Sequence, residues 1–280
     1  MIRPRMGTTE LDGIARELLA AFDGRGTVQS IAARHPGFDW EDAYRIGAAL
    51  CALRRARGER PIGRKIGFTN RNIWAQYGAT APIWGAVYDR TVIHAEDSRA
   101  EVSLRGAVRP RLEPEIAFKL ARAVPAGLSD PIEILEHVEW VAASFEIVDC
   151  HFADWKFQAA DAVADFSLHW RLVLGTPLVV SATELSALAV QLHDCDLSLR
   201  QNEAVVASGT GANALGHPAM ALSHLADVLA GQPEANPLEA GEIITTGTLT
   251  PAMPIQAGET WRSTYAGIAL AGLTVSFSGA

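Results

Sequence analysis

Three glutamates are spaced in a way that suits the binding of a divalent cation. Glu113 and Glu115 lie two residues apart in RLEPEIAFKL, and Glu146 follows in the apolar segment WVAASFEIVDC. Side chains at this spacing on a strand point to the same face, roughly 6–7 Å apart, so a cation can bridge the two carboxylates. An ionised Glu146 buried among apolar residues needs a charge partner or a metal. Oxygen ligands without thiolate or imidazole favour Mg²⁺ or Mn²⁺ over zinc.

A simpler interpretation of the first two glutamates is also open. Glu113 and Glu115 can be solvated charges that pair with Arg109, Arg111 or Lys119, which is the commoner fate of surface carboxylates. The spacing by itself does not choose between the two interpretations.

Composition restricts the class of protein. The chain has 280 residues, of which 49% are hydrophobic and 20% charged, so it can bury a large core. A formal net charge of −8 argues against nucleic-acid and membrane partners. Three widely spaced cysteines give no disulfide framework and no metal knuckle. The start, MIRPRMGTTE, lacks the apolar segment of a secretion signal, so we expect a cytoplasmic protein.

Helical patterns dominate the first part of the chain. Residues 9–23 place apolar side chains at helical spacing, and Gly24 is a suitable stop. A second helix is expected after Asp39, whose carboxylate can cap it. A later helix is expected over residues 218–230, with proline in its first turn.

After Pro61 the pattern changes to short apolar runs separated by glycine and proline, which predicts strands and loops. The predicted strands cover residues 86–93, 113–120, 139–149, 169–180, 189–202, 203–209, 242–249, 259–268 and 269–277. We therefore expect a mainly helical N-terminal region over residues 1–90, packed on a β-rich catalytic domain over residues 91–280.

Six segments together resemble a known family. They are GRKIGFTN (63–70), RLEPEIAFKL (111–120), FEIVDCHFADWKFQAADAVADFS (145–167), GTGANALGHPAMALSHLADVLA (209–230), AGEIITTGTLT (240–250) and AGETWRSTYAGIALAGLTVSF (257–277). In this order they resemble the fumarylacetoacetate hydrolase superfamily, in the branch of the 2-keto-4-pentenoate hydratases, 2-oxohepta-3-ene-dioate hydratases and 4-oxalocrotonate decarboxylases.

The resemblance implies an α+β fold, a mixed β-sheet roll with flanking helices and a helical N-terminal region. It also implies a divalent metal, Mg²⁺ or Mn²⁺, held by Glu113, Glu115 and Glu146, and a small 2-oxo acid as substrate. A homo-oligomer is usual in the family, and a partner enzyme of the same pathway is a further possibility.

Three residues are candidates for catalysis, and two of them, Lys65 and Asp165, lie in the matching segments. Lys65 stands where the family has a lysine that faces the substrate and assists proton transfer or carboxylate binding. Asp165 lies in a run that resembles a family segment with two aspartates. His169 can supply a polar group where this chain departs from the family, although a lone histidine is more often structural.

Three further residues are predicted to contact the substrate. Phe166 stands where the family usually has an asparagine, and Trp84 lies in a segment where many hydratases have an acidic residue before the glycine. Trp84 can narrow the pocket or simply pack in the core. Thr248 matches a family hydroxyl near the substrate carboxylate.

We expect the activity of a metal-dependent hydratase that adds water to a 2-hydroxydienoate in the breakdown of aromatic compounds. The cation would neutralise charge that grows on the C2 oxygen when an enolate forms. The same site would also serve a 4-oxalocrotonate decarboxylase or an acylpyruvate C–C hydrolase. The decarboxylase needs a cationic side chain, such as Arg71 or Arg90, to bind the distal carboxylate of its substrate. A partner subunit that has lost its activity is the non-enzymatic alternative.

Overall fold

The larger of two mixed β-sheets contains the strands that carry the glutamates. The structure, a computed structural model, describes residues 5–71, 74–232 and 235–279. In these residues the sheet has nine strands, in the order β2-β1-β11-β5-β6-β7-β3, with β12 beside β5 and β8 beside β6. They are β1 (Pro61–Gly67), β2 (Ile83–Tyr88), β3 (Val92–His94), β5 (Arg111–Leu120), β6 (Val138–Val148), β7 (His169–Leu174), β8 (Leu178–Val179), β11 (Ile243–Thr245) and β12 (Met253–Pro254).

A smaller sheet packs beside the first. Its five strands among the described residues follow the order β10-β9-β13-β14-β4. Their bounds are β4 (Arg99–Ser103), β9 (Asp196–Gln201), β10 (Ala204–Thr210), β13 (Thr260–Ala266) and β14 (Thr274–Ser278). Both sheets are mixed, since β1–β11, β3–β7 and β4–β14 are parallel pairs and the other pairs are antiparallel.

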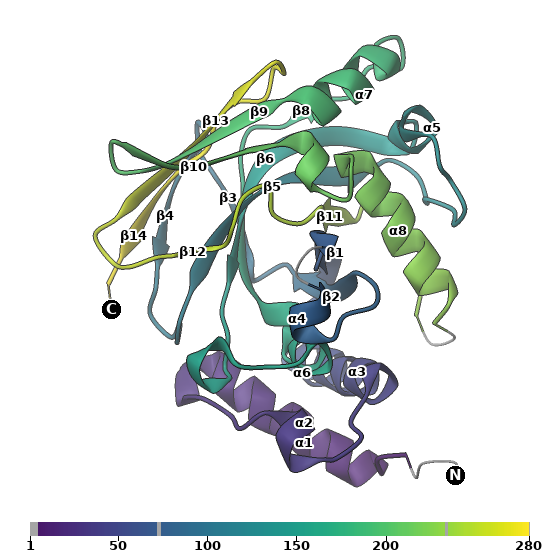
Figure 1. The fold of residues 1–280 in the computed structure, drawn as a ribbon, viewed down its shortest axis with the longest axis vertical. Helices are drawn as coiled ribbons and strands as arrows, with labels where there is room; N and C mark the ends of the chain where they lie inside the picture. The colour runs from purple at the N-terminus through teal and green to yellow at the C-terminus, as the bar shows by residue number, and fades with distance from the viewer. Residues whose placement is uncertain (1–4, 72–73, 233–234, 280) are drawn as a thin grey trace.

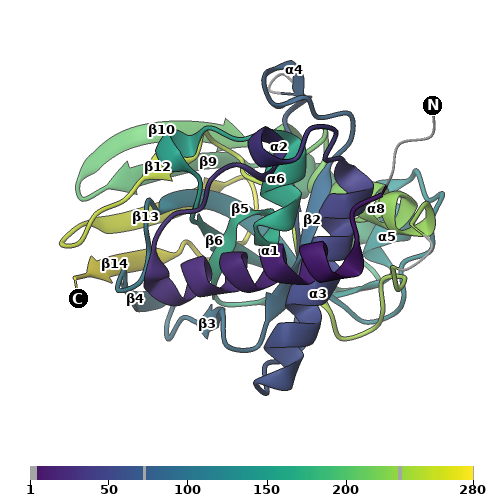
Figure 2. The ribbon, with the colours of Figure 1, turned by 90° about the horizontal axis from the view of Figure 1, so that it is seen from below.

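Helices cover the sheets from two sides. Figure 1 shows α1 (Thr8–Ala20), α2 (Ile31–Arg34), α3 (Trp40–Ala56) and α6 (Ala159–Ala164) gathered at the lower end, and Figure 2 shows α1 and α3 crossing one another. The other helices are α4 (Trp74–Tyr77), α5 (Pro131–Leu135), α7 (Leu185–Asp194) and α8 (Pro218–Ala230), of which α5, α7 and α8 lie toward the opposite end. This α+β arrangement of mixed sheets, flanking helices and a helical N-terminal region confirms the predicted fold class.

The first helices form where the sequence predicts them. Leu11, Ile14 and Leu18 are buried along α1, and the helical stretch turns at Gly24, whose φ is +84°. Asp39 caps α3 by accepting a hydrogen bond from the backbone N–H of Asp42 at 3.0 Å. Both helices bury their apolar side chains in a common core with the large sheet.

One predicted strand is wrong over part of its length. Residues 189–194 belong to helix α7, and the strand begins only at Asp196. Leu188, Ala189 and Leu192 are the buried residues of this helix, a spacing of three to four residues that fits one helical face. The two-part division at residue 90 stays a prediction, and β1 and β2, which precede that boundary, pair within the large sheet.

None of the helices that the structure describes is long and apolar enough to span a membrane.

Candidate metal and substrate site

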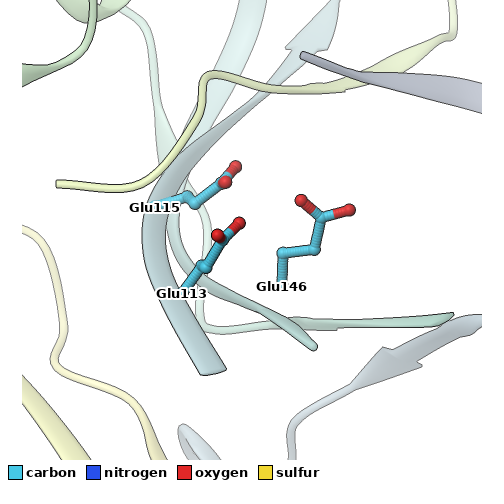
Figure 3. Close-up of side chains that lie close together, drawn as sticks. All are labelled: Glu113, Glu115 and Glu146. Atoms are coloured by element: carbon cyan, nitrogen blue, oxygen red, sulfur yellow. The ribbon is translucent and has the colours of Figure 1, made fainter. Parts of the chain in front are cut away.

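Strand pairing brings the three glutamates together. Strands β5 and β6 are antiparallel, and Glu113 lies directly opposite Glu146 in their register. Glu115 follows two residues after Glu113 and therefore points to the same face. One carboxylate oxygen from each residue lies within 4.8 Å of the others, and Figure 3 shows the three carboxylates converging from two strands. This arrangement could hold one cation.

Burial makes this concentration of negative charge costly. Glu115 and Glu146 are fully buried, whereas Glu113 is partly exposed. Desolvation raises the pKa of Glu113 to about 7, with the Lys65 charge opposing the shift and the Glu146 charge adding to it. Desolvation and the charges of Glu146 and Glu113 raise the pKa of Glu115 well above its ordinary value. A divalent cation would relieve this repulsion.

Lys65 reaches the same cluster from a strand two places away. It pairs with Thr245 on β11, which pairs with Ala117 on β5, so its side chain shares the face that carries the glutamates. The ammonium Nζ lies 3.0 Å from Glu146 Oε2, and the side chain is 3% exposed. Burial alone would lower the pKa of Lys65, but the three carboxylates together raise it. Lys65 is thus held as a cation in the metal-free protein.

His169 lies behind Glu146 and orients it. Its Nδ1 is 2.9 Å from Glu146 Oε1, and its Nε2 is 2.9 Å from the hydroxyl of Thr91. Burial lowers the pKa of His169 although Glu146 opposes this shift. Because both ring nitrogens are engaged and the ring is buried, His169 can position Glu146 but does not face the cavity. Nothing in the sequence indicates that Thr91 contacts His169, since Thr91 lies in the turn between β2 and β3.

The segment after β11 completes the site. The backbone N–H of Gly247 donates a hydrogen bond to Glu115 Oε2 at 3.1 Å. Gly247 has a φ of +86°, and a Cβ there would lie 2.2 Å from Thr69 Oγ1, so only glycine fits. The other oxygen, Glu115 Oε1, is buried without a hydrogen-bond partner among the described residues. An unpartnered carboxylate oxygen aimed into an all-oxygen cluster fits a Mg²⁺ or Mn²⁺ ion.

A cavity of about 830 Å³ opens from this cluster. We call it the carboxylate cavity, because Lys65 and Glu113 line its buried end. Thr248 lines it as well, and its hydroxyl donates to the carbonyl oxygen of Thr250 at 2.7 Å. The structure therefore places Thr248 beside the predicted metal ligands and the predicted catalytic lysine.

Sequence reasoning missed several residues of this cavity. Arg111 stands two residues before Glu113 on β5, so it shares the face of the metal ligands, and its guanidinium lies 3.9 Å from the centre of the Trp155 ring. The R-x-E-x-E spacing in the sequence could have placed Arg111 on the same strand face as Glu113 and Glu115. The aromatic side chains that line the cavity are Phe68, Tyr77, Trp155 and Phe157.

Trp84 and Phe166 lie away from the carboxylate cavity. Lys65 pairs with Gly85, so the neighbouring Trp84 points to the opposite face of the sheet. Both aromatic residues line a second, larger groove of about 1290 Å³ between α3, β2 and α8, which we call the outer groove. A direct contact of either residue with a substrate would require the substrate to reach this groove. The two residues that follow Phe166, Ser167 and Leu168, line the carboxylate cavity, whereas Phe166 itself does not.

Asp165 also lies outside the cavity. Its carboxylate is fully buried, 2.7 Å from His151 Nδ1, and accepts a hydrogen bond from the backbone N–H of His151 at 3.2 Å. Asp165 thereby fixes the segment after β6, close to the turn that leads into β7. The structure thus gathers Lys65 with the three predicted metal ligands but separates Asp165 from them.

The sequence of this chain is similar to those of several known proteins. Residues 84–276 match the fumarylacetoacetate (FAA) hydrolase C-terminal family. A 2-hydroxyhexa-2,4-dienoate hydratase from Comamonas testosteroni is 35% identical over 87% of this chain and 89% of its own length. A 2-keto-4-pentenoate hydratase from Paraburkholderia phymatum is 30% identical over 96% and 97%. A 4-oxalocrotonate decarboxylase from a Pseudomonas species is 34% identical over 78% and 79%.

A solved structure has the same fold over nearly the whole chain. It is the 4-oxalocrotonate decarboxylase from Pseudomonas putida G7, complexed with magnesium and adipate. The TM-score is 0.88 at 24% identity, with 98% of this chain and all of the other covered. Because 98% of the chain is covered, the shared fold includes the N-terminal helices as well as the sheet roll.

Proposed function

The chain belongs to the fumarylacetoacetate hydrolase family, and from this premise we propose that it is a divalent-metal-dependent hydratase that adds water to a 2-hydroxydienoate. The observation that carries the proposal is the convergence of three carboxylates beside a buried lysine at the end of an open cavity. The relatives named as a 2-hydroxyhexa-2,4-dienoate hydratase and a 2-keto-4-pentenoate hydratase, at 35% and 30% identity, support the same activity.

The proposed ligands are Glu113, Glu115 and Glu146, and their all-oxygen donor set suits Mg²⁺ or Mn²⁺. A bound divalent cation would stabilise the negative charge on the C2 oxygen of a 2-oxo acid as it becomes an enolate. His169 and Gly247 hold two of these carboxylates in place, so little reorganisation is needed.

Lys65 is the proposed proton donor. Its ammonium lies at the cavity end beside Glu146, and the three carboxylates keep it charged in the metal-free protein. A bound divalent cation would weaken that stabilisation and lower the lysine pKa toward the range of general acid–base catalysis. Lys65 can then protonate the remote carbon C5 of the dienol while the 2-hydroxyl loses its proton to solvent, from which Lys65 regains a proton. The resulting 2-oxo-3-enoate then adds water across its double bond, with the hydroxyl on C4 and the hydrogen on C3. Thr248 can accept a hydrogen bond from the substrate, since its own proton is donated to Thr250.

A purified sample and a freshly generated 2-hydroxypenta-2,4-dienoate test the proposal. We expect loss of the dienol ultraviolet absorbance with Mg²⁺, formation of 4-hydroxy-2-oxopentanoate, and no reaction with EDTA. Equal rates with and without EDTA would contradict the metal assignment, and absence of the hydroxy-oxo acid would contradict hydration.

A decarboxylase of the same branch is the second candidate. The relative named 4-oxalocrotonate decarboxylase is 34% identical, and Arg71 lines the carboxylate cavity, where it could bind a distal carboxylate. Arg90, the other cation considered for this role, is exposed and is not among the residues that line the cavity. Loss of 2-hydroxyhexa-2,4-dienedioate with release of CO₂, without turnover of the monoacid, would favour this activity.

The assembly of several copies, a partner enzyme of the same pathway and a cytoplasmic location stay predictions from the sequence.

A further inference from the structure

Four aromatic side chains form one wall of the carboxylate cavity. We call Phe68, Tyr77, Trp155 and Phe157 the aromatic wall. The rings of Tyr77 and Phe157 stack at 5.0 Å between centroids, and those of Phe68 and Tyr77 stack at 5.4 Å. Trp155 and Phe157 are tilted at 6.2 Å. All four side chains are only partly buried, so the wall presents apolar ring surface to the cavity.

The two ends of the aromatic wall are held in an unfavourable backbone conformation. Phe68 and Trp155 both have a φ of +55°, in the left-handed region that bulky residues rarely adopt. Hydrogen bonds hold both places, since Trp74 Nε1 donates to the Phe68 carbonyl oxygen at 2.7 Å and Trp155 Nε1 donates to the Arg109 carbonyl oxygen at 3.2 Å. Such backbone strain is concentrated at ligand-binding sites, because it fixes side chains that packing alone would not place there.

Two arginines, Arg71 and Arg111, line the carboxylate cavity in addition to Lys65. Arg111 is partly buried, and its charge opposes the desolvation that raises the pKa of the nearby Glu113 carboxyl. It lies two residues from Glu113 and stacks on Trp155, so it stands between the metal ligands and the aromatic wall and can bind the carboxylate of a 2-oxo acid. Arg71 also lines the cavity but is exposed, and an exposed arginine in water binds a second carboxylate weakly.

The cavity is also larger than a five-carbon acid requires. Its volume of about 830 Å³ is near the upper end of the roughly 300–1,000 Å³ typical of pockets for drug-sized ligands. A substrate whose carboxylate is bound by Arg111, beside the proposed metal ligands, would extend its remote end along the aromatic wall, because Arg111 stacks on Trp155.

From these observations we propose that the site takes 2-oxo acids, and the dienols derived from them, whose remote end carries an uncharged apolar or aryl group, with the aromatic wall as the specificity-determining surface. This inference rests on the proposed function and narrows its substrate class. It predicts that a second carboxylate at the remote end is disfavoured, because the ring surface cannot hydrate or pair it.

Binding of saturated 2-oxo acids to the Mn²⁺-loaded protein tests this specificity without catalysis. Calorimetry would compare 2-oxopentanoate, 2-oxo-5-phenylpentanoate and 2-oxohexanedioate. We expect the phenyl compound to bind at least ~10-fold more tightly than 2-oxopentanoate, in line with the roughly 10–200-fold discrimination that small apolar groups give. The dicarboxylate should bind no more tightly than 2-oxopentanoate. Equal affinity for the phenyl compound and 2-oxopentanoate, or tightest binding of the dicarboxylate, would overturn the proposal.

Matched variants locate the effect in the aromatic wall. Phe157→Leu and Tyr77→Leu should each reduce the preference for the phenyl compound by several-fold while Mn²⁺ binding is retained. Trp140→Leu removes a partly buried aromatic ring from β6 at a place outside the cavity, and it should keep the wild-type preference. A preference that survives both wall variants would overturn the role of the wall.

Turnover separates this inference from the proposed function. Hydration of 2-hydroxypenta-2,4-dienoate without any gain for 2-hydroxy-5-phenylpenta-2,4-dienoate would leave the proposed function standing and refute the substrate class. Tight binding of the phenyl compound with no hydration of any dienol would refute the hydratase and keep the apolar specificity of the site.

Discussion

Two of the buried charge clusters among the described residues are built differently. In the first, Arg54 is 1% exposed and is bonded by both Nε and Nη2 to Glu59, at 2.8 and 2.5 Å, while its guanidinium lies 3.8 Å from the centre of the Tyr88 ring. In the second, three glutamates share one lysine, and Glu115 Oε1 has no hydrogen-bond partner among the described residues.

The difference separates a structural cluster from a functional one. Arg54 and Glu59 balance one another, and Arg57 also binds Glu59, so the pKa of Glu59 falls although its desolvation alone would raise it. This cluster joins α3 to the large sheet, although Arg54 Nη1 is also buried without a hydrogen-bond partner among the described residues. The glutamate cluster keeps an excess of negative charge, which raises the pKa of Glu113 and Glu115. An unbalanced buried charge, more than burial itself, points to a missing cation.

Removal of a metal ligand should have the largest effect. Glu146→Ala is expected to lower metal-dependent turnover by on the order of 10³-fold or more, because a catalytic cation supplies several kcal/mol of transition-state stabilisation. The protein should remain folded, since Glu113 and Glu115 still compensate the charge of the buried Lys65. Steady-state kinetics with Mg²⁺ measures the loss. Glu139→Ala, an exposed glutamate on the same strand, is the control. Retained Mg²⁺-stimulated turnover in Glu146→Ala would refute the ligand assignment.

Breaking the balanced cluster should affect stability instead. Arg54→Met is expected to lower the free energy of unfolding by about 3–5 kcal/mol, because it leaves the Glu59 carboxylate buried with less compensation. Urea denaturation measures this change. The control is Arg55→Met, which changes the exposed neighbour of Arg54. Mn²⁺ affinity should stay the same in the folded fraction. A large loss of metal affinity with little loss of stability would mean that the two clusters do not have separate roles.

Metal addition should stabilise the unbalanced cluster. At a free Mg²⁺ concentration 100 times Kd, we expect about 2.7 kcal/mol of added stability, because the ion binds the folded state. Thermal denaturation with Mg²⁺ and with EDTA measures the shift in Tm. Glu115→Gln should abolish most of it, whereas Arg55→Met should leave it intact. A shift of equal size in Glu115→Gln would show that the ion binds elsewhere.

The pH dependence should reveal the raised carboxylate pKa values in the metal-free protein. Glu113 has a folded pKa of about 7, against roughly 4.3 for an unperturbed glutamate. Between these values the folded state holds more protons than the unfolded state, so the contribution of Glu113 to stability is lost as the pH rises toward 7.

Mn²⁺ affinity should rise over the same range, because a cation must displace the proton. Urea denaturation with EDTA and Mn²⁺ titration, each at several pH values, would measure the two slopes. Glu113→Gln should flatten the part of the stability slope that Glu113 contributes. An unchanged stability slope in that variant would contradict the assigned pKa.

The smallest effect is expected from Thr91, which contacts His169 rather than a proposed metal ligand. Thr91→Val removes the hydroxyl 2.9 Å from His169 Nε2 and should weaken Mn²⁺ binding by about 10-fold, as is typical when an outer-shell partner is lost. Free Mn²⁺, measured by electron paramagnetic resonance, reports the affinity, and the exposed Thr176→Val is the control. Unaltered affinity in Thr91→Val would mean that His169 orients Glu146 without help.

Local patterns in the sequence determined a large part of the fold and the candidate ligands. The i, i+2 spacing of Glu113 and Glu115 placed both on one strand face, and helix capping by Asp39 and the apolar spacing of α1 follow from neighbours in the chain. These features depend on dihedral angles and periodicities that extend over a few residues. The ordered segments that resemble the family supplied the expected sheet roll.

Only the tertiary structure decided which side chains meet. Strand register put Glu146 opposite Glu113, turned Trp84 away from Lys65, and brought Thr91 to His169 across 78 positions of the chain. A shift of one residue in register moves every side chain of a strand to the other face, and nothing within a single strand reveals its partner. The shared strand face of Glu113 and Glu115 was therefore readable from local spacing. Their meeting with Glu146, the groups that position the three carboxylates and the aromatic wall were not, because they depend on contacts between distant segments.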